Sequence, residues 1–411
     1  MKILMVNRVL YPRSASETVM FRLADALRAL GHEVSFFAQD DARNAALPGA
    51  YVVKQMPVGR VAAVKRVMYD KGAMECMLQR IRADRPQLAL VFQVNRTLSF
   101  SVVDALKQKG IPTYVMVTDY TPLCPARTMT RHGRNCNACA ARHSFWPCVI
   151  HRCLEDHRAR SLLGAAEAWQ MRQRCRWNLP TGYLVPSDYP RRLLEESRFT
   201  AKPIRTVNLP VDETRFAGFV PKKGDYFLFV GAVETRKGLM TLLRAMAQCV
   251  CSLPLAIIGD GPELPAFRRK AAELGLQGRV SFHGQLSSDA VRQAMAEALC
   301  VITPSECEEI APWALLEAQL LGKPAIASRF GVLPERVQEG KNGLLFDPGD
   351  SLALAQCLDR MAAMEAGDYQ AMAQKTREDA LCRYSMRAYA CRVLETVTYT
   401  YGDANWRDKL T

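Results

Sequence analysis

The sequence predicts two α/β domains, each built on a doubly wound parallel sheet. Short apolar runs alternate with longer amphipathic segments along most of the 411 residues, which is typical of parallel strands joined by crossover helices. The alternation falls into two blocks, separated by an irregular segment over residues 203–216. A chain of this length also exceeds what a single hydrophobic core usually holds.

The first block opens with an apolar run at residues 2–6 and closes near residue 205. Gly31 ends its first helix, because glycine tolerates the left-handed backbone that often follows the last helical turn. Runs rich in Val, Ile, Phe and Tyr indicate the strands. The expected strands are 2–6, 32–38, 88–92, 113–117 and 183–185, with helices near 17–30 and 101–109.

The second block repeats the pattern, and a further helix follows it. The expected strands are 226–231, 254–259, 280–284, 300–305 and 324–328, with helices near 239–249, 265–274 and 290–298 and another from Pro312. A last helical segment at about 384–410 is expected to cross back to the first domain. We therefore expect domains at 1–205 and 206–385, a Cys- and His-rich insert at about 124–157 and a C-terminal helix at 386–411.

Positive charge is concentrated in the first half of the chain. Residues 1–220 carry 33 Lys and Arg against 18 Asp and Glu, whereas residues 221–411 carry 22 against 23. This asymmetry indicates an anionic partner, and the absence of zinc-finger, RNA-recognition and helix-turn-helix patterns argues against nucleic acid. The basic stretch 58–85 fits either an amphipathic helix on anionic lipid or the solvated face of a core helix.

The cysteine content and the hydropathy pattern indicate in which compartment of the cell the protein is expected. Fourteen cysteines without an export signal are typical of a reducing environment. The first apolar run is interrupted at Asn7 and Arg8, too early for a signal peptide, and no run approaches the roughly 20 residues of a membrane span. We expect a cytoplasmic protein that binds peripherally to the inner face of the membrane through its basic half.

Two carboxylates eight positions apart, Glu309 and Glu317, are the most informative pair in the second block. Pro312 suits the first turn of a helix, because its fixed φ and missing N–H cost nothing there. Glu309 is then expected in the entering loop, and Glu317 more than one turn inside the helix. Helix N-termini attract phosphate, so the pair predicts a ligand with an anionic group and hydroxyls. By spacing alone, an amphipathic helix with one solvated glutamate fits as well.

Further loops open at the same predicted sheet edge. Gly231 ends a strand and precedes Arg236 and Lys237, two cations at a helix start that suit a diphosphate. Gly259 and Gly261 follow the next strand, where a missing side chain lets a ring or a phosphate approach the backbone. A lone Gly-x-Gly more often marks a tight turn. Because the carboxyl ends of parallel strands share one edge, the loops together predict one ligand site.

In this order the motifs resemble the retaining glycosyltransferases of family 4. The resemblance is dense from about residue 227 to residue 350. It runs through Arg236-Lys237-Gly238, Gly259-Asp-Gly-Pro262, Phe282-His-Gly284, Glu309-x7-Glu317 and Gly322-Lys-Pro. It implies the GT-B fold, which has two Rossmann-like domains facing a central cleft. It also implies a UDP- or GDP-sugar donor, a glycan or lipid-linked acceptor, and catalysis without a cofactor.

The resemblance also assigns roles to individual residues. Arg236 and Lys237 would neutralise the leaving diphosphate, Glu317 would hold the ribose hydroxyls, and Glu309 would contact the donor sugar. The backbone near the next two strand ends would cradle the base. The donor site expected on this basis comprises Gly231, Arg236, Lys237, Gly259, Gly261, His283, Gly284, Glu309 and Glu317, with Glu309, Lys237 and Arg236 as the catalytic candidates. The residues expected on the acceptor side are Ser14, Ser16, Glu17 and Asp119.

Two other classes share this fold. A sugar-nucleotide epimerase would need neither an acceptor site nor a basic face, and a non-catalytic subunit would be expected to lose Lys237 or the glutamate pair. The presence of all three residues favours the transferase. The basic first half favours a lipid-linked or polysaccharide acceptor in cell-envelope glycan synthesis, with lipopolysaccharide as one such product.

A Cys- and His-rich stretch follows Cys124-Pro125. The spacing of Cys136-x2-Cys139 and Cys148-x4-Cys153 suits a closed tetrahedral zinc site. Reduced thiols packed in a core and a redox disulfide are the alternatives that the spacing leaves open. Because the insert follows a strand of the first domain, it is also expected to shape the acceptor site.

Overall fold

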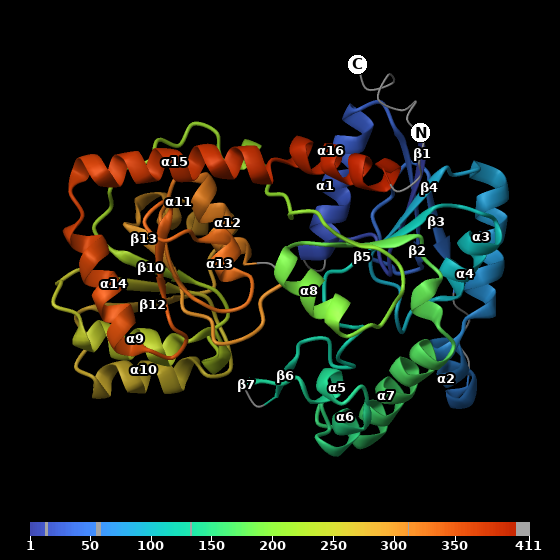
Figure 1. Ribbon diagram of the computed structural model, residues 1–411, viewed down its shortest axis with the longest axis horizontal. Helices are drawn as coiled ribbons and strands as arrows, with labels where there is room; N and C mark the ends of the chain where they lie inside the picture. The colour runs from blue at the N-terminus through green and yellow to red at the C-terminus, as the bar shows by residue number, and fades with distance from the viewer. Residues whose placement is uncertain (13–14, 55–58, 132–133, 311, 400–411) are drawn as a thin grey trace. The chain divides into compact units, whose positions relative to one another are not determined.

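The computed structural model describes residues 1–12, 15–54, 59–131, 134–310 and 312–399. Contacts divide the chain into two compact units. Unit 1 comprises Met1–Met129, Asn137–Pro210 and Met386–Thr411, and unit 2 comprises Thr130–Cys136 and Val211–Ser385. Each unit contains a parallel sheet flanked by helices (Figure 1), so the predicted fold class is confirmed.

Unit 1 is built on a seven-stranded parallel sheet in the order β3-β2-β1-β4-β5-β8-β9. Its strands are β1 Lys2–Val6, β2 Glu33–Gln39, β3 Ala50–Val53, β4 Leu88–Val91, β5 Thr113–Met116, β8 Gly182–Val185 and β9 Ile204–Thr206. Strands β4, β5 and β8 are buried at every position, as expected for a sheet covered on both faces. The strand order reverses between β1 and β4, and open parallel sheets bind ligands at such a point.

Unit 2 has a six-stranded parallel sheet in the order β12-β11-β10-β13-β14-β15. Its strands are β10 Phe227–Val230, β11 Leu255–Ile258, β12 Val280–Gly284, β13 Cys300–Thr303, β14 Ala325–Ser328 and β15 Gly343–Phe346. The unit also holds the hairpin of β6 Thr130–Arg131 and β7 Arg134–Asn135. Here the order reverses between β10 and β13.

Successive residues of β10 serve opposite faces of the unit 2 sheet, since side chains alternate along a strand. Phe227 and Phe229 belong to a core cluster with residues of α9, α10 and α14, whereas Leu228 belongs to one with residues of α11, α12 and α15. These helices are α9 Leu239–Gln248, α10 Leu264–Glu273, α11 Ser288–Glu297, α12 Trp313–Leu320, α14 Ser351–Ala363 and α15 Ala366–Tyr384. A continuous core therefore fixes the strand ends from which the loops emerge.

After α15 the chain returns to unit 1 as α16, Met386–Tyr399. There α16 packs against α1, Ala15–Ala29. Tyr114 on β5 donates a hydrogen bond of 3.0 Å from its hydroxyl to the backbone carbonyl of Val397. The remaining longer helices of unit 1 are α3 Lys71–Asp84, α4 Ser101–Gln108, α7 Arg158–Gln173 and α8 Asp188–Glu196.

Residues 59–85 of the basic stretch form two helices rather than one amphipathic helix. The first, α2 Arg60–Met68, is followed by Asp70, whose side chain caps α3 by accepting the N–H of Ala73 at 3.0 Å. Three apolar side chains of α3, those of Ala73, Met77 and Ile81, are buried in unit 1 and are not available to a lipid surface. Among the described residues, no helix is both long and apolar enough to cross a membrane.

Candidate active site

A cavity of about 320 Å³ opens at the carboxyl edge of the unit 2 sheet, beside the loops that follow β10 and β13. Gly231 and Lys237 come from the first loop, and Glu309 comes from the second. Helix α12 begins directly after Pro312, so Glu309 lies in the entering loop and Glu317 lies within the helix, as predicted. The spacing of the two glutamates therefore brings both carboxylates to one cavity.

Lys237 and Glu309 form an ion pair in this cavity. The pair is possible because Gly238, with a φ of 72°, lets the two loops approach. A Cβ at this position would lie 1.8 Å from the carbonyl oxygen of Pro304. Ser305 donates a hydrogen bond of 2.7 Å to Glu309 Oε1. Only 18% of the Lys237 side chain and 12% of the Glu309 side chain are exposed, so the two charges face the cavity with little competing water.

Glu317 lines the same cavity, but its electrostatic surroundings differ from those of Glu309. Its carboxylate makes no hydrogen bond and no ion pair with any residue that the structure describes, although the residue is half-buried. Burial raises the pKa of Glu317, and the guanidinium groups of Arg215 and Arg292 offset this shift only in part. An ionised group that loses water without gaining a partner destabilises the fold. A ligand with hydroxyl donors would supply the missing partners.

Arg236 does not line the cavity. Its guanidinium pairs with Glu234 at 2.5 Å and lies 3.6 Å from Cys307 Sγ. Although burial opposes the shift, Glu234 raises the pKa of Arg236. The backbone carbonyl of Arg236 also accepts the N–H of Glu306 at 2.9 Å. Arg236 is thus held within the loops that frame the cavity, while Lys237 reaches the cavity itself.

The glycines after β11 and β12 hold neighbouring loops together. A Cβ on Gly259 would lie 1.9 Å from the carbonyl oxygen of Gly231, and the Gly259 N–H donates to the Gly284 carbonyl at 2.8 Å. A Cβ on Gly261 would likewise meet a backbone carbonyl, at 2.4 Å. His283 is exposed, with its ring 2.9 Å from Ser281 Oγ. The cavity lining does not include Gly259, Gly261, His283 or Gly284, and their contact with a base stays a prediction.

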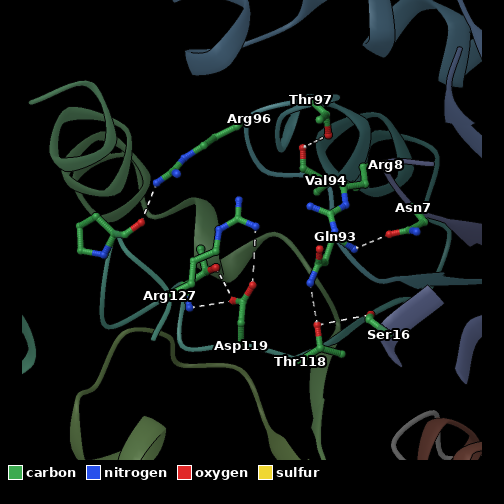
Figure 2. Close-up of polar contacts among 12 residues, drawn as sticks. Asn7, Arg8, Ser16, Gln93, Val94, Arg96, Thr97, Thr118, Asp119 and Arg127 are labelled. Atoms are coloured by element: carbon green, nitrogen blue, oxygen red, sulfur yellow. Dashed lines mark hydrogen bonds and ion pairs between the residues drawn. The ribbon is translucent and has the colours of Figure 1, made fainter. Parts of the chain in front are cut away.

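Three of the residues expected on the acceptor side, Ser16, Glu17 and Asp119, lie in unit 1, and Figure 2 shows Ser16 and Asp119. Glu17 is fully buried and pairs with Arg8 at 3.2 Å. The hydroxyl of Ser16 donates to that of Thr118 at 3.5 Å. Ser14 lies outside the described residues. The loops after β1 and β5 and the start of α1 therefore meet in one polar network.

Asp119 and Arg127, whose side chains lie together in Figure 2, line a small cavity of about 40 Å³ beside this network. Their side chains are 3.8 Å apart, and the Arg127 guanidinium makes no hydrogen bond among the described residues. Burial lowers the pKa of Arg127; Asp119 opposes this shift and Arg96 adds to it. The buried Oε1 of Gln93 also accepts from no described residue. Aromatic side chains line the cavity as well: Phe92, Phe100, Trp177 and Tyr183.

Sequence reasoning missed Arg127 and Gln93. Gln93 is not distinguished from other glutamines by any motif, and Arg127 lies in the Cys-rich insert, three positions after Cys124. The φ of Arg127 is 71°, a left-handed conformation that is uncommon outside glycine. The fold alone brings this residue to Asp119.

The cysteines of the insert fall into different parts of the structure. Cys139 and Cys148 are buried in a small core with Phe145, and Cys153 packs against it, whereas Cys136 belongs to unit 2. Burial, with Cys153, Cys139 and Cys124 nearby, raises the pKa of Cys148 to about 12. Among the described residues, no three ligand atoms of the insert lie within 4.8 Å of one another. A structural zinc ion there stays a prediction.

Two family models match the chain. "Glycosyl transferases group 1" matches residues 210–379, and "Glycosyltransferase Family 4" matches residues 16–215. The sulfoquinovosyl transferase SQD2 of Arabidopsis thaliana is 34% identical over 126 residues, which are 30% of this chain and 24% of that protein. The lipopolysaccharide core biosynthesis glycosyltransferase LpsE of Rhizobium meliloti is 30% identical over 143 residues, 35% of this chain and 41% of LpsE. The matches span less than half the length of either relative.

Among solved structures, that of Anabaena Alr3699/HepE in complex with UDP has a TM-score of 0.68 and covers 97% of this chain and 100% of its own. At 17% identity this likeness shows the fold alone. Two doubly wound parallel-sheet units of this kind define the GT-B class of proteins. Within that class the chain belongs to glycosyltransferase family 4, because the two family models together match it from residue 16 to residue 379.

Proposed function

We propose that the protein transfers a sugar from a nucleotide-diphosphate sugar to a hydroxyl of a glycan or lipid-linked acceptor, with retention at the anomeric carbon. The observation that carries this proposal is the unit 2 cavity, where the Lys237 ammonium and the unpartnered Glu317 carboxylate line one space. A diphosphate needs a cation and ribose hydroxyls need an acceptor, so a nucleotide diphosphate satisfies both groups. Family membership and the UDP-bound HepE neighbour support this ligand class.

Lys237 is the residue that meets the leaving group. Negative charge grows on the nucleoside diphosphate as its bond to the anomeric carbon breaks, and a cation already in position stabilises that charge without reorganisation. Arg236, from the same short helix η3 Thr235–Lys237, is paired with Glu234, so we assign the charge at the leaving group to Lys237, and the proposed mechanism requires no metal ion. Because Lys237 is paired with Glu309 in the free protein, a bound diphosphate competes for the ammonium and frees Glu309 for the donor sugar.

Retention follows when the acceptor hydroxyl attacks from the face that the diphosphate leaves. The bond from the anomeric carbon to the diphosphate oxygen breaks, the bond from the acceptor oxygen forms, and a diphosphate oxygen takes the acceptor proton. No protein nucleophile takes part. Glu309 stabilises the positive charge that develops at the anomeric carbon, and Glu317 holds the ribose throughout.

The acceptor is assigned to the unit 1 cavity, in which Asp119 offers an acceptor, Arg127 offers donors and Gln93 offers a free carbonyl. Sugar hydroxyls both donate and accept hydrogen bonds, so they can pair with all three groups. The name of the relative LpsE supports a cell-envelope glycan. The net positive charge of residues 1–220 supports binding to the anionic inner surface of the membrane, on the cytoplasmic side.

The test is incubation of the purified protein with UDP-, GDP- and ADP-sugars, with and without glycan or lipid-linked acceptors. At least one combination of donor and acceptor should release nucleotide only when the acceptor is present. NMR of the product should show the same anomeric configuration, α or β, as in the donor. Lys237→Ala should abolish this release, whereas Lys341→Ala, at an exposed lysine of the same unit, should not. A changed donor sugar without acceptor would instead indicate an epimerase and refute the proposal.

A further inference from the structure

A second group of ligand-type side chains lies in unit 2, outside the donor cavity. Cys249 ends α9, Cys251 follows two residues later, and Asp359 lies on α14, which packs against α9. Their ligand atoms all lie within 4.8 Å of one another. Within the part of the chain that the structure describes, no other trio of Cys, His, Asp or Glu side chains meets this condition.

The distances in this trio match those of a tetrahedral metal site. The two sulfur atoms are 3.8 Å apart, and two zinc–sulfur bonds of about 2.3 Å at a tetrahedral angle require a separation of about 3.8 Å. A disulfide would require about 2.0 Å. Asp359 is oriented by two backbone N–H groups, from Cys251 at 2.8 Å and from Val250 at 3.2 Å. Each carboxylate oxygen keeps a second lone pair for an ion.

The charges around the trio also suit a divalent cation. Arg279 donates from Nη2 to Cys249 Sγ at 3.3 Å and to the Cys251 carbonyl at 2.7 Å. Two thiolates, one carboxylate and one guanidinium sum to −2, which a divalent ion neutralises. In metal sites, residues that do not themselves bind the metal often donate such hydrogen bonds to the ligands and orient them. Without an ion, burial and the neighbouring Cys249 raise the pKa of Cys251 to about 12.

The group lies at the opposite edge of the sheet from the donor cavity. Helix α9 starts next to Lys237, at the carboxyl ends of the strands, and its ten residues extend about 15 Å away from that edge. Cys251 lies just before the start of β11, at Leu255. Val250, between the two cysteines, is 92% exposed, so an ion can enter from solvent. An ion here would act on the fold of unit 2 and not on sugar transfer.

We propose that Cys249, Cys251 and Asp359 bind one zinc ion, with water as the fourth ligand, and that the ion ties the loop before β11 to α14. On binding, each thiol loses its proton to solvent, and the carboxylate binds in its ionised form. Two sulfur ligands and one oxygen ligand favour zinc over magnesium or calcium, which prefer oxygen alone. This proposal is independent of the proposed sugar transfer.

The test uses the full chain, stripped of metal under reducing conditions and titrated with Co²⁺ as a spectroscopic probe and then with Zn²⁺. Wild type is compared with Cys251→Ser and with Asp359→Asn. The matched control is Cys382→Ser, which removes an exposed thiol of the same unit. Because the insert has its own predicted zinc site, the informative quantity is the difference in bound metal between each variant and wild type.

Wild type and Cys382→Ser are expected to bind one more equivalent of metal than Cys251→Ser, with a cobalt–thiolate absorption band that Zn²⁺ displaces. Asp359→Asn should weaken binding by about tenfold or more. Zn²⁺ should also raise the melting temperature of wild type more than that of Cys251→Ser, which keeps its acceptor-dependent nucleotide release. Equal metal content and equal cobalt spectra in wild type and Cys251→Ser would overturn the proposal. A Cys249–Cys251 disulfide that persists in the stripped, reduced protein would do the same.

Discussion

Replacing Glu317 with glutamine is expected to stabilise the protein and weaken nucleotide binding at the same time. Burial raises the pKa of Glu317, so the folded chain holds this proton more tightly than the unfolded chain does. The ionised carboxylate therefore opposes folding at every pH above its folded pKa, and the opposition vanishes below the unfolded value of 4.5. Glutamine has almost the same shape and no charge, so the variant should gain stability at neutral pH and none in acid.

The loss of affinity follows from the hydrogen bonds that the ribose would make. A hydrogen bond to a charged acceptor contributes about 1.5–3 kcal/mol, and one to a neutral acceptor contributes about 0.5–1.5 kcal/mol. The difference of about 1–1.5 kcal/mol for each bond corresponds to roughly a 5–15-fold change in affinity. Two ribose hydroxyls can reach one carboxylate, so the loss of about 2–3 kcal/mol should lower nucleotide affinity between about 30-fold and 150-fold.

Two measurements on the same samples check this expectation. Calorimetric titration with UDP and GDP gives the affinity, and urea unfolding at neutral and acidic pH gives the free energy of unfolding. Glu365→Gln, at an exposed glutamate of unit 2, should change neither quantity. The reasoning is refuted when Glu317→Gln gains stability at neutral pH while its affinity for every nucleoside diphosphate stays at the wild-type value. A variant that loses stability at neutral pH refutes the sign assigned to the buried charge.

Further substitutions separate the other charged residues. Glu309→Gln should lower kcat about 100-fold, because a negative charge that faces the transition state is lost, and should change the affinity for UDP little. A fall in UDP affinity as large as the fall in kcat would contradict the assignment of Glu309 to the donor sugar. Arg127→Gln should raise the KM for acceptor about tenfold and leave the KM for donor unchanged, in steady-state kinetics with each substrate varied. For Lys323, burial lowers the pKa to about 8, so its ammonium opposes folding below that pH. The free energy of unfolding of wild type relative to that of Lys323→Met should therefore rise by about 3 kcal/mol between pH 8 and 10.5. If this difference between the two proteins does not change with pH, the lowered pKa of Lys323 is contradicted.

The local rules of helices and strands made much of unit 2 predictable. Strands appear in sequence as short apolar runs, and the sheet edge to which each loop belongs follows from the parallel direction of the strands. Pro312 fixes the start of α12 by its own geometry, so the positions of Glu309 and Glu317 relative to that helix could be derived. Gly238 was also recognisable, although its reason, the approach of the Pro304 carbonyl, is a tertiary contact.

What could not be derived depends on local turns and on contacts between distant segments. Arg127 meets Asp119, eight positions earlier, because the chain turns back between them, with Arg127 at a φ of 71°. Cys251 and Asp359 are 108 positions apart in the chain and meet because α9 and α14 pack together. Single-sequence patterns also could not divide the basic stretch 58–85, where the cap at Asp70 starts a second helix. Periodicity carries no information on these pairings.

Two charged residues of the same motif region show how burial separates structural from functional groups. Lys323 is 1% exposed, and its ammonium donates to the carbonyls of Lys222 at 2.7 Å and Ala298 at 2.8 Å, so hydrogen bonds within the fold offset part of the cost of burying its charge. Glu317 is half-buried on a cavity, and no described residue satisfies its carboxylate. A fold that keeps an unsatisfied charge beside empty space is less stable than it could be. A ligand that arrives with hydroxyl donors removes that cost, and this is why Glu317, and not Lys323, is assigned to the donor site.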